Sequence, residues 1–273
     1  MFEKNCLEGQ AGIITGGSSG IGLGMAVELA KHGAKLTITG RNEEKLKKAA
    51  QFIKEESSSP YDVLTCQGDV RKKDQVEQNL KAHKDHHQKV DFLINNAAGN
   101  FLCSLEKMSE NAFQSVMGIV THGTFLWSKA VLSSMKEQKR GNIINIGAHY
   151  ALNGGPWVAH SGAAKAAVLN LTKSQAAEWG PYGINSNMII PGPIEETEGV
   201  KRLMPDSSLK EGFKKLIPLQ RMGKTSDVAA LAIFLLTPLG SYINGAAIPV
   251  DGGISLTTPG LLPYGIDVEK YLS

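Results

Sequence analysis

A glycine-rich turn between a strand and a helix constrains the fold of this chain more than any other feature of its sequence. The apolar run 11–15 predicts a buried strand, and residues 20–32 have the pattern of an amphipathic helix. The turn that joins them contains Thr15, Gly16, Gly17, Ser18, Ser19, Gly20, Ile21 and Gly22. Glycines let the backbone approach a pyrophosphate, and the start of a helix offers N–H groups to it. The motif predicts a dinucleotide site, and an ordinary tight turn is the alternative.

The rest of the chain alternates short apolar runs with amphipathic stretches. Further strands are predicted at 35–39, 62–66, 90–95, 142–147, 184–190 and 246–250. Helices are predicted at 43–56, 72–86, 109–138, 160–179 and 225–236. Strands that alternate with helices form parallel sheets with right-handed crossovers. We therefore expect an α/β protein with a single-domain Rossmann fold over residues 1–273. Its sheet should be doubly wound and parallel, with about seven strands.

One long irregular stretch, at about 191–218, interrupts this alternation after the sixth predicted strand. An excursion at this point of an open α/β sheet is well placed to cover a substrate, so we predict a substrate loop there.

Composition and charge exclude several classes of protein. The net charge of +3 is too small to predict nucleic-acid binding. The three cysteines are far apart, which indicates a reducing compartment and neither a disulfide framework nor a zinc site, so no metal is expected. No apolar run approaches the roughly 20 residues of a membrane span. The first residues resemble no signal or transit peptide, and the last three are not the peroxisomal S-K-L address. A soluble intracellular protein is expected, without membrane insertion.

The second predicted strand ends at Gly40 and Arg41. Enzymes that use NAD commonly place an acidic residue here to hold the ribose hydroxyls. A guanidinium instead suits the 2′-phosphate of NADPH, by charge and by paired hydrogen bonds. NADPH is therefore the predicted cofactor, and a solvated arginine at the start of the next helix is the alternative.

Several spaced motifs resemble the short-chain dehydrogenase/reductase family over residues 8–255. They are the glycine turn, Asp69-Val70, Asn95-Asn96-Ala97-Ala98-Gly99, Lys165 and Pro191-Gly192-Pro193-Ile194. The resemblance implies that Asp69 and Val70 flank the adenine and that Lys165 binds the nicotinamide ribose. It also implies that the cofactor is lined by Asn95, Ala97, Gly99, Pro191, Gly192, Pro193 and Ile194.

The chain departs from the usual family pattern at the catalytic positions. Most members carry Tyr-x-x-x-Lys with a serine thirteen residues before the tyrosine, and here these positions hold Ser161 and Ala148. An aliphatic hydroxyl is a far weaker acid than a phenol with a pKa near about 10, so a ketoreductase is not expected. Tyr150, fifteen residues before Lys165, can supply a phenol from another direction.

This displaced tyrosine resembles that of the 2,4-dienoyl-CoA reductases. The strings 96–101, 177–180, 191–199 and 218–221 are also similar to that subfamily. In its mitochondrial type, a tyrosine and an asparagine at the positions of Tyr150 and Asn100 are the catalytic pair. The peroxisomal type lacks the tyrosine but shares the Asn-Phe-Leu-Cys string found here at 100–103. Because the chain combines both, the resemblance implies a peroxisome or a mitochondrion without choosing between them.

The resemblance implies a reaction in β-oxidation of unsaturated fatty acids that turns a 2,4-dienoyl-CoA into a 3-enoyl-CoA. Hydride reaches the δ-carbon, while Tyr150 and Asn100 stabilise negative charge on the thioester oxygen. A water near Ser161 and Lys165, which share a helix face, would protonate the α-carbon. The acyl-CoA would contact Arg41, Arg71, Phe101, Ser109 and Arg202. A homo-oligomer, either a dimer or a tetramer, is expected by the same resemblance.

Each of these assignments has a plainer alternative. Tyr150 could lie in a surface loop, Asn100 could shape a turn, and Ser161 could cap its helix. The basic runs 71–73 and 201–202 could be solvated faces rather than contacts of the CoA phosphates. His122 and His149 lie near the expected pocket, with structural or acid roles both open. His83, His86 and His87 are predicted on a solvated helix. Trp127, Phe125 and the helix 109–138 are expected in the core or a subunit interface.

Two other functions remain open from the sequence. A trans-2-enoyl-CoA reductase would use the same cofactor and ligand but place the hydride on the β-carbon. A non-catalytic NADPH-binding homologue would explain the loss of the usual tyrosine and serine, although Tyr150 and Asn100 argue against it.

Overall fold

Seven parallel strands form one sheet at the centre of the protein. The computed structural model describes residues 2–195, 197, 211 and 214–256. The strands are β1 Ala11–Thr15, β2 Lys35–Gly40, β3 Leu64–Gln67, β4 Phe92–Asn95, β5 Gly141–Ile146, β6 Ile184–Pro191 and β7 Ala247–Val250. Their order is β3-β2-β1-β4-β5-β6-β7, with every neighbouring pair parallel. The order reverses direction between β1 and β4, which confirms the predicted doubly wound α/β fold.

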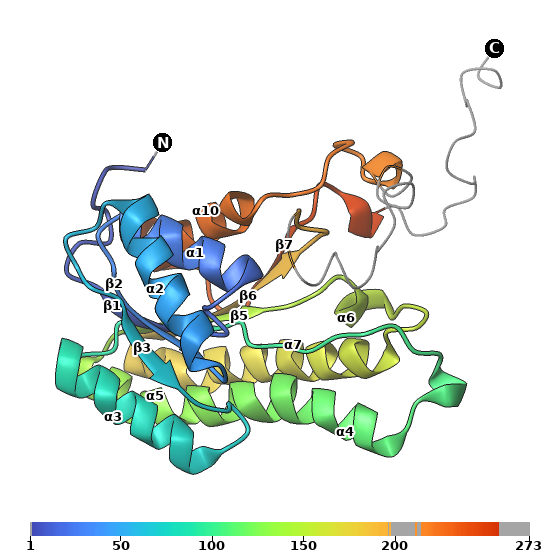
Figure 1. Ribbon diagram of the computed structural model, residues 1–273, viewed down its shortest axis with the longest axis horizontal. Helices are drawn as coiled ribbons and strands as arrows, with labels where there is room; N and C mark the ends of the chain where they lie inside the picture. The colour runs from blue at the N-terminus through green and yellow to red at the C-terminus, as the bar shows by residue number, and fades with distance from the viewer. Residues whose placement is uncertain (1, 196, 198–210, 212–213, 257–273) are drawn as a thin grey trace.

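Helices cover both faces of this sheet (Figure 1). On one face lie α1 Gly20–Lys31, α2 Glu43–Ser57 and α10 Thr225–Leu236. On the other lie α3 Lys73–His87, α4 Glu110–Met117, α5 Gly123–Gln138 and α7 Ala159–Trp179. A short helix, α6 Tyr150–Asn153, sits at the end of the molecule beside the start of α7 (Figure 1). Among the helices of the described ranges, none is both long and apolar enough to cross a bilayer.

The core has one apolar layer on each face of the sheet. The first packs Ile14 and Ile38 against α1, α2 and α10. The second packs Leu93 and Ile143 around Trp127 of α5, which is 1% exposed. Trp127 therefore belongs to the core, whereas Phe125 on the same helix is exposed.

The structure differs from the sequence prediction in two helices. The predicted helix 109–138 runs from Glu110 to Gln138, but it contains a π-helical segment, Gly118–His122, between α4 and α5. The prediction that His83 is solvated is wrong, since its ring faces the sheet and is 0% exposed. Its Nδ1 bonds to Oγ1 of Thr37 in β2 at 2.7 Å, and its Nε2 to the carbonyl oxygen of Lys89 at 2.9 Å. The sequence prediction failed because lysines flank His83 and made the whole helix appear solvated.

The predicted substrate loop at 191–218 lies largely outside the described residues. At its start, Gly192 donates its backbone N–H to the carbonyl oxygen of Val250, and Ile194 bridges to Gly223. These contacts attach the beginning of the loop to the carboxyl end of β7 and to the segment just before α10.

Candidate active site

Tyr150 lies at the start of α6, four residues beyond the carboxyl end of β5. Its helix packs closely against α7 at Gly162, where a Cβ atom would be only 3.2 Å from the carbonyl oxygen of Tyr150. A glycine at this position lets α6 approach the first turns of α7. The phenol is thereby held against the helix that carries Ser161 and Lys165, and it is not a free surface-loop side chain.

The Tyr150 hydroxyl is the centre of a small hydrogen-bonded cluster. Nδ2 of Asn100, from the loop after β4, donates to it at 3.0 Å. Oγ of Ser161, from α7, lies 3.3 Å away and also donates to it. The structure thus brings together three of the residues singled out in the sequence, from three different segments.

Ser161 does not cap its helix. The helix α7 begins at Ala159, with Val158 preceding it, so Ser161 lies inside the first turn and is buried. Lys165 lies four residues further on and therefore on the same face of the helix. Its Nζ donates to the carbonyl oxygen of Ile146, the last residue of β5.

Burial changes the acidity of two of these groups. Burial raises the pKa of Tyr150, although the hydrogen bond from Ser161 acts in the opposite direction. The phenol therefore stays protonated at neutral pH and can donate a hydrogen bond. Burial also lowers the pKa of Lys165 to about 8. The ammonium charge of Lys165 is consequently easier to lose than that of a surface lysine.

The glycine turn packs closely against the neighbouring strand and loop. A Cβ on Gly17 would lie 2.7 Å from Cγ2 of Ile38, and one on Gly22 would lie 2.4 Å from Nδ2 of Asn96. Gly16 has a φ of +64°, which side chains rarely adopt. The Ser19 side chain makes no capping hydrogen bond to the first turn of α1, and an uncapped helix start of this kind suits an anion.

Two side chains near this turn form hydrogen bonds within the protein. The Thr15 hydroxyl accepts the backbone N–H groups of Asn96 and Ala97, each at 3.0 Å, and so joins the loops after β1 and β4. Nδ2 of Asn95 donates to Asn145 at 2.9 Å and to Ser128 at 3.1 Å. The Asn95 side chain therefore points into the interior.

The residues expected around the adenosine end lie beyond β2 and β3. Arg41 is exposed, and Ser18 lies next to Gly40, where a Cβ would be 3.5 Å from the serine Oγ. Asp69 forms an ion pair with Arg71, whose Nε lies 3.0 Å from Oδ1. Hydrogen bonding to Arg71 lowers the pKa of Asp69, and the charge of Arg41 acts in the same direction. The Arg71 guanidinium is thus engaged with Asp69.

The remaining predicted contacts are placed as follows. Val70 and Ile194 are buried, Gly99 lies beside Ile119, and Gly192 lies beside Asp251. Ser109 caps α4 by accepting the backbone N–H of Ala112. Gly20 and Ile21 are the first two residues of α1, Pro191 is the last residue of β6, and Pro193 lies in the loop that follows. Arg202 and Lys201 lie outside the described residues.

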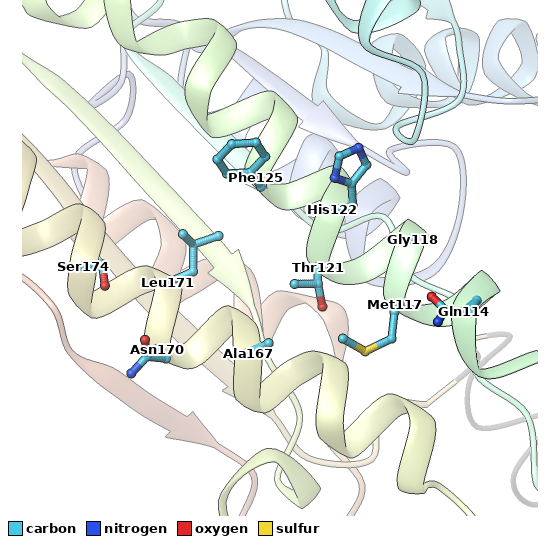
Figure 2. A pocket seen from close by; sticks show the side chains of 10 residues that line it. All are labelled: Gln114, Met117, Gly118, Thr121, His122, Phe125, Ala167, Asn170, Leu171 and Ser174. Atoms are coloured by element: carbon cyan, nitrogen blue, oxygen red, sulfur yellow. The ribbon is translucent and has the colours of Figure 1, made fainter. Parts of the chain in front are cut away.

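The two histidines left open in the sequence have different surroundings. The ring of His149 lies 5.1 Å from the ring of Tyr150, and burial lowers its pKa. His122 instead lies on the outer side of the helix layer, in a groove of about 700 Å³ between α4–α5 and α7 (Figure 2). The groove is lined by Gln114, Met117, Gly118, Thr121, His122, Phe125, Ala167, Asn170, Leu171 and Ser174. None of the Tyr150 cluster lines it.

Sequence reasoning missed a buried polar network and one buried histidine. Asn145, in the apolar run of β5, donates to Oγ1 of Thr172 at 2.9 Å and so attaches α7 to the sheet. An asparagine inside a strand that is otherwise apolar could have signalled it. His160, next to Ser161, is 0% exposed and stacks on Phe101 with a centroid distance of 4.2 Å. Within the described ranges, no group of His, Cys, Asp and Glu side chains could hold a metal ion.

Known proteins are similar to this chain over almost its whole length. The family model described as "Enoyl-(Acyl carrier protein) reductase" matches residues 16–255. A probable 2,4-dienoyl-CoA reductase of Bacillus subtilis, described as (2E)-enoyl-CoA-producing, is 43% identical over 90% of this chain and 97% of its own. The peroxisomal 2,4-dienoyl-CoA reductase of Danio rerio, described as (3E)-enoyl-CoA-producing, is 38% identical over 100% of this chain and 88% of its own.

Solved structures agree with this likeness. A short chain dehydrogenase from Bacillus anthracis is 42% identical, with a TM-score of 0.86 over 95% of this chain and 100% of its own. The structure of levodione reductase is 32% identical, with a TM-score of 0.87 over 92% of this chain and 99% of its own.

Proposed function

The chain belongs to the short-chain dehydrogenase/reductase family, and on that premise we propose that it is an NADPH-dependent 2,4-dienoyl-CoA reductase of β-oxidation. The observation that carries this proposal is the hydrogen-bonded cluster of Tyr150, Asn100 and Ser161. The cluster supplies a phenol from α6, while the helix position that usually carries the family tyrosine holds Ser161. The relatives named 2,4-dienoyl-CoA reductase support the same assignment.

The family uses a nicotinamide cofactor, and the residues of this chain favour NADPH. The glycine turn and the uncapped start of α1 would hold the pyrophosphate. Arg41, exposed beside Ser18 and Gly40, would bind the 2′-phosphate, for which its guanidinium is suited. Lys165 would bind the nicotinamide ribose.

Tyr150 and Asn100 act on the thioester oxygen of the substrate. A reduced nicotinamide supplies the hydride that the δ-carbon of the dienoyl chain receives. Negative charge then accumulates on the thioester oxygen, where hydrogen bonds from the Tyr150 phenol and the Asn100 amide stabilise it. Because burial raises the pKa of Tyr150, the phenol keeps its proton and remains a donor at neutral pH.

The proton acceptor of the second half-reaction is the α-carbon. Protonation there leaves a 3-enoyl-CoA, whereas protonation at the γ-carbon would leave a 2-enoyl-CoA. The Ser161 hydroxyl lies beside Tyr150, the proposed partner of the thioester oxygen, so a water held near Ser161 and Lys165 would lie nearer the α-carbon. This arrangement favours the (3E)-enoyl product in the name of the Danio rerio relative over the (2E)-enoyl product in the name of the Bacillus subtilis relative.

The proposal is tested by following NADPH oxidation with 2,4-hexadienoyl-CoA, with crotonyl-CoA and a 3-ketoacyl-CoA as comparators. We expect selective turnover of the dienoyl thioester and a 3-enoyl product by mass spectrometry and chromatography. Turnover of crotonyl-CoA alone would indicate a trans-2-enoyl-CoA reductase. Tight NADPH binding without turnover of any thioester would indicate a non-catalytic homologue. Reduction of the ketone alone would contradict the role given to Tyr150.

A homo-oligomer is part of the same proposal. The groove between α4–α5 and α7 includes the exposed Phe125, and it lies on the outside of the helix layer (Figure 2). We expect two copies to pair across this face. Light scattering of wild type and Phe125→Glu tests this expectation, since the charged variant should shift to a smaller species.

The proposed compartment is intracellular, in a peroxisome or a mitochondrion. Relatives from Danio rerio and Saccharomyces cerevisiae that carry "peroxisomal" in their names support the first of these. Fluorescence microscopy of the tagged chain with markers for both organelles would distinguish them.

A further inference from the structure

His160 is a buried histidine with two ring nitrogens that are unpaired among the described residues. Its exposed fraction is 0%, and neither Nδ1 nor Nε2 has a hydrogen-bond partner in the part of the chain that the structure describes. His83 is equally buried, yet both of its nitrogens are bonded. A buried polar group without a partner is costly, and folded proteins leave few of them. The two nitrogens of His160 are therefore unpaired inside the folded protein, and a ligand reaches them only where the cover over the ring opens.

The position of His160 connects it to both sides of the Tyr150 cluster. It directly precedes Ser161, whose Oγ donates to Tyr150. Its ring stacks on Phe101, with centroids 4.2 Å apart and an interplanar angle of 28°. Phe101 in turn follows Asn100 and donates its backbone N–H to Oδ1 of that residue at 2.9 Å. A ligand bound at Tyr150 and Asn100 would therefore have His160 as a near neighbour.

The charge state of His160 limits what that ligand group can be. Burial lowers the pKa of His160, so the ring is neutral at neutral pH. A neutral imidazole has one N–H donor and one acceptor nitrogen. An ionised phosphate oxygen only accepts hydrogen bonds, so it would leave the acceptor nitrogen of the ring unpaired, and a hydrocarbon chain offers no partner. A secondary amide matches the ring, because it has both a carbonyl acceptor and an N–H donor.

We propose that His160 binds the first amide of the pantetheine arm of the acyl-CoA. This inference rests on the proposed function, which supplies the acyl-CoA. The thioester oxygen already has Tyr150 and Asn100 as partners, and the acyl tail beyond the diene has no polar atoms. The first pantetheine amide, two methylenes from the thioester sulfur, is the next polar group along the ligand. His160 thus fixes how the arm enters the site.

Two variants distinguish the contribution of the ring nitrogens of His160 from that of its flat ring. His160→Phe keeps a flat ring against Phe101 and removes both nitrogens, and His160→Gln keeps a donor and an acceptor without the ring. The first readout is the Kd of 2,4-hexadienoyl-CoA in the presence of NADP⁺, which needs no turnover. We expect His160→Phe to raise this Kd about three- to tenfold, the size expected for one neutral hydrogen bond. The Kd of NADP⁺ should not change. His160→Gln should bind the thioester more tightly than His160→Phe.

The second readout uses truncated substrates that differ only in the amide. The hexadienoyl thioester of N-acetylcysteamine keeps the first amide, and the hexadienoyl thioester of pentanethiol lacks it. His160→Phe should lower kcat/KM for the first and leave the second unchanged. An equal loss with both thioesters, or an unchanged Kd for the CoA thioester, would overturn the assignment. The matched control is His83→Phe, which removes two hydrogen bonds within the protein. It should lower Tm without a selective effect on either thioester.

The two readouts also distinguish this inference from the proposed function. If the wild type reduces no dienoyl thioester, the proposed reaction is wrong. The Kd comparison still decides whether His160 contributes to binding the CoA thioester.

Discussion

The side-chain amide of Asn100 has a defined orientation toward Tyr150. Oδ1 of Asn100 accepts the backbone N–H of Phe101 at 2.9 Å, and Nδ2 lies 3.0 Å from the Tyr150 hydroxyl. A backbone N–H can only donate, so the oxygen of the amide must face Phe101 and the nitrogen must face Tyr150. The Tyr150 oxygen therefore accepts a hydrogen bond from Asn100, and its own proton remains free for another acceptor.

This orientation leaves the cluster with two hydrogen-bond donors that can both bind one thioester oxygen of the substrate. The second N–H of the Asn100 amide and the O–H of Tyr150 both remain available, and each can point at a thioester oxygen. Donors that are positioned before the reaction begins are the arrangement that stabilises developing negative charge most effectively. The local geometry thus supports a role for Asn100 beyond that of a turn residue.

Removing the phenolic hydroxyl should impair the reaction without impairing cofactor binding. Tyr150→Phe is expected to lower kcat with 2,4-hexadienoyl-CoA by about 10²- to 10³-fold, because one of the two donors to the thioester oxygen is lost. The Kd of NADPH, measured by fluorescence, should stay within about twofold, since Tyr150 contacts only the substrate in this mechanism. Tyr182→Phe, at an exposed tyrosine, serves as the control. Unchanged kcat in Tyr150→Phe would rule out its role.

Replacing the hydrogen-bond donor of Asn100 by an acceptor tests whether its amide nitrogen donates to the thioester oxygen. Asn100→Asp replaces the donor nitrogen by a carboxylate oxygen, which repels the charge that forms on the thioester oxygen. We expect kcat/KM to fall by at least about a hundredfold. Asn153→Asp, at an exposed position at the end of α6, adds the same charge nearby. Steady-state kinetics of the two variants should differ strongly, and equal losses would indicate a general effect of negative charge.

The alternation of strands and helices made the fold predictable, whereas short elements were not. The run 11–15 is apolar enough to specify β1 from sequence alone. α6 has only four residues, too few for any helical period, so its presence depends on packing against α7 at Gly162. The π-helical segment before α5 likewise has no signature in the apolar pattern.

The candidate site was predictable in its residues but not in its contacts. The spacing of Tyr150 from Lys165 indicated a displaced phenol, and the family resemblance indicated Asn100. The hydrogen bond between them depends on two loops that meet only in the folded protein. His160 could not be identified from sequence, because whether a histidine nitrogen has a partner depends on every surrounding group.

The guanidinium of Arg41 should determine which nicotinamide cofactor is used. Arg41→Ala is expected to raise the Kd of NADPH by roughly tenfold to a hundredfold, because charge-assisted hydrogen bonds to the 2′-phosphate are lost. The Kd of NADH, which lacks that phosphate, should change little. Lys47→Ala, a charge removal on the exposed face of α2, is the control. Equal weakening of both cofactors would contradict the assignment of Arg41 to the phosphate.

Acid should destabilise the protein through His83. Burial lowers the folded-state pKa of His83 to about 4, against 6.5 for the ordinary side chain. Between these values the unfolded chain binds a proton that the folded protein does not, so the free energy of unfolding must fall as pH decreases from 6.5 to 4. His83→Gln removes this titration but also weakens the bonds to Thr37 and Lys89, so it should be less stable than wild type at neutral pH. Urea unfolding at several pH values should show the advantage of the wild type shrinking steadily over that window. A difference that is independent of pH would mean that His83 titrates at the same pH in the folded and unfolded states.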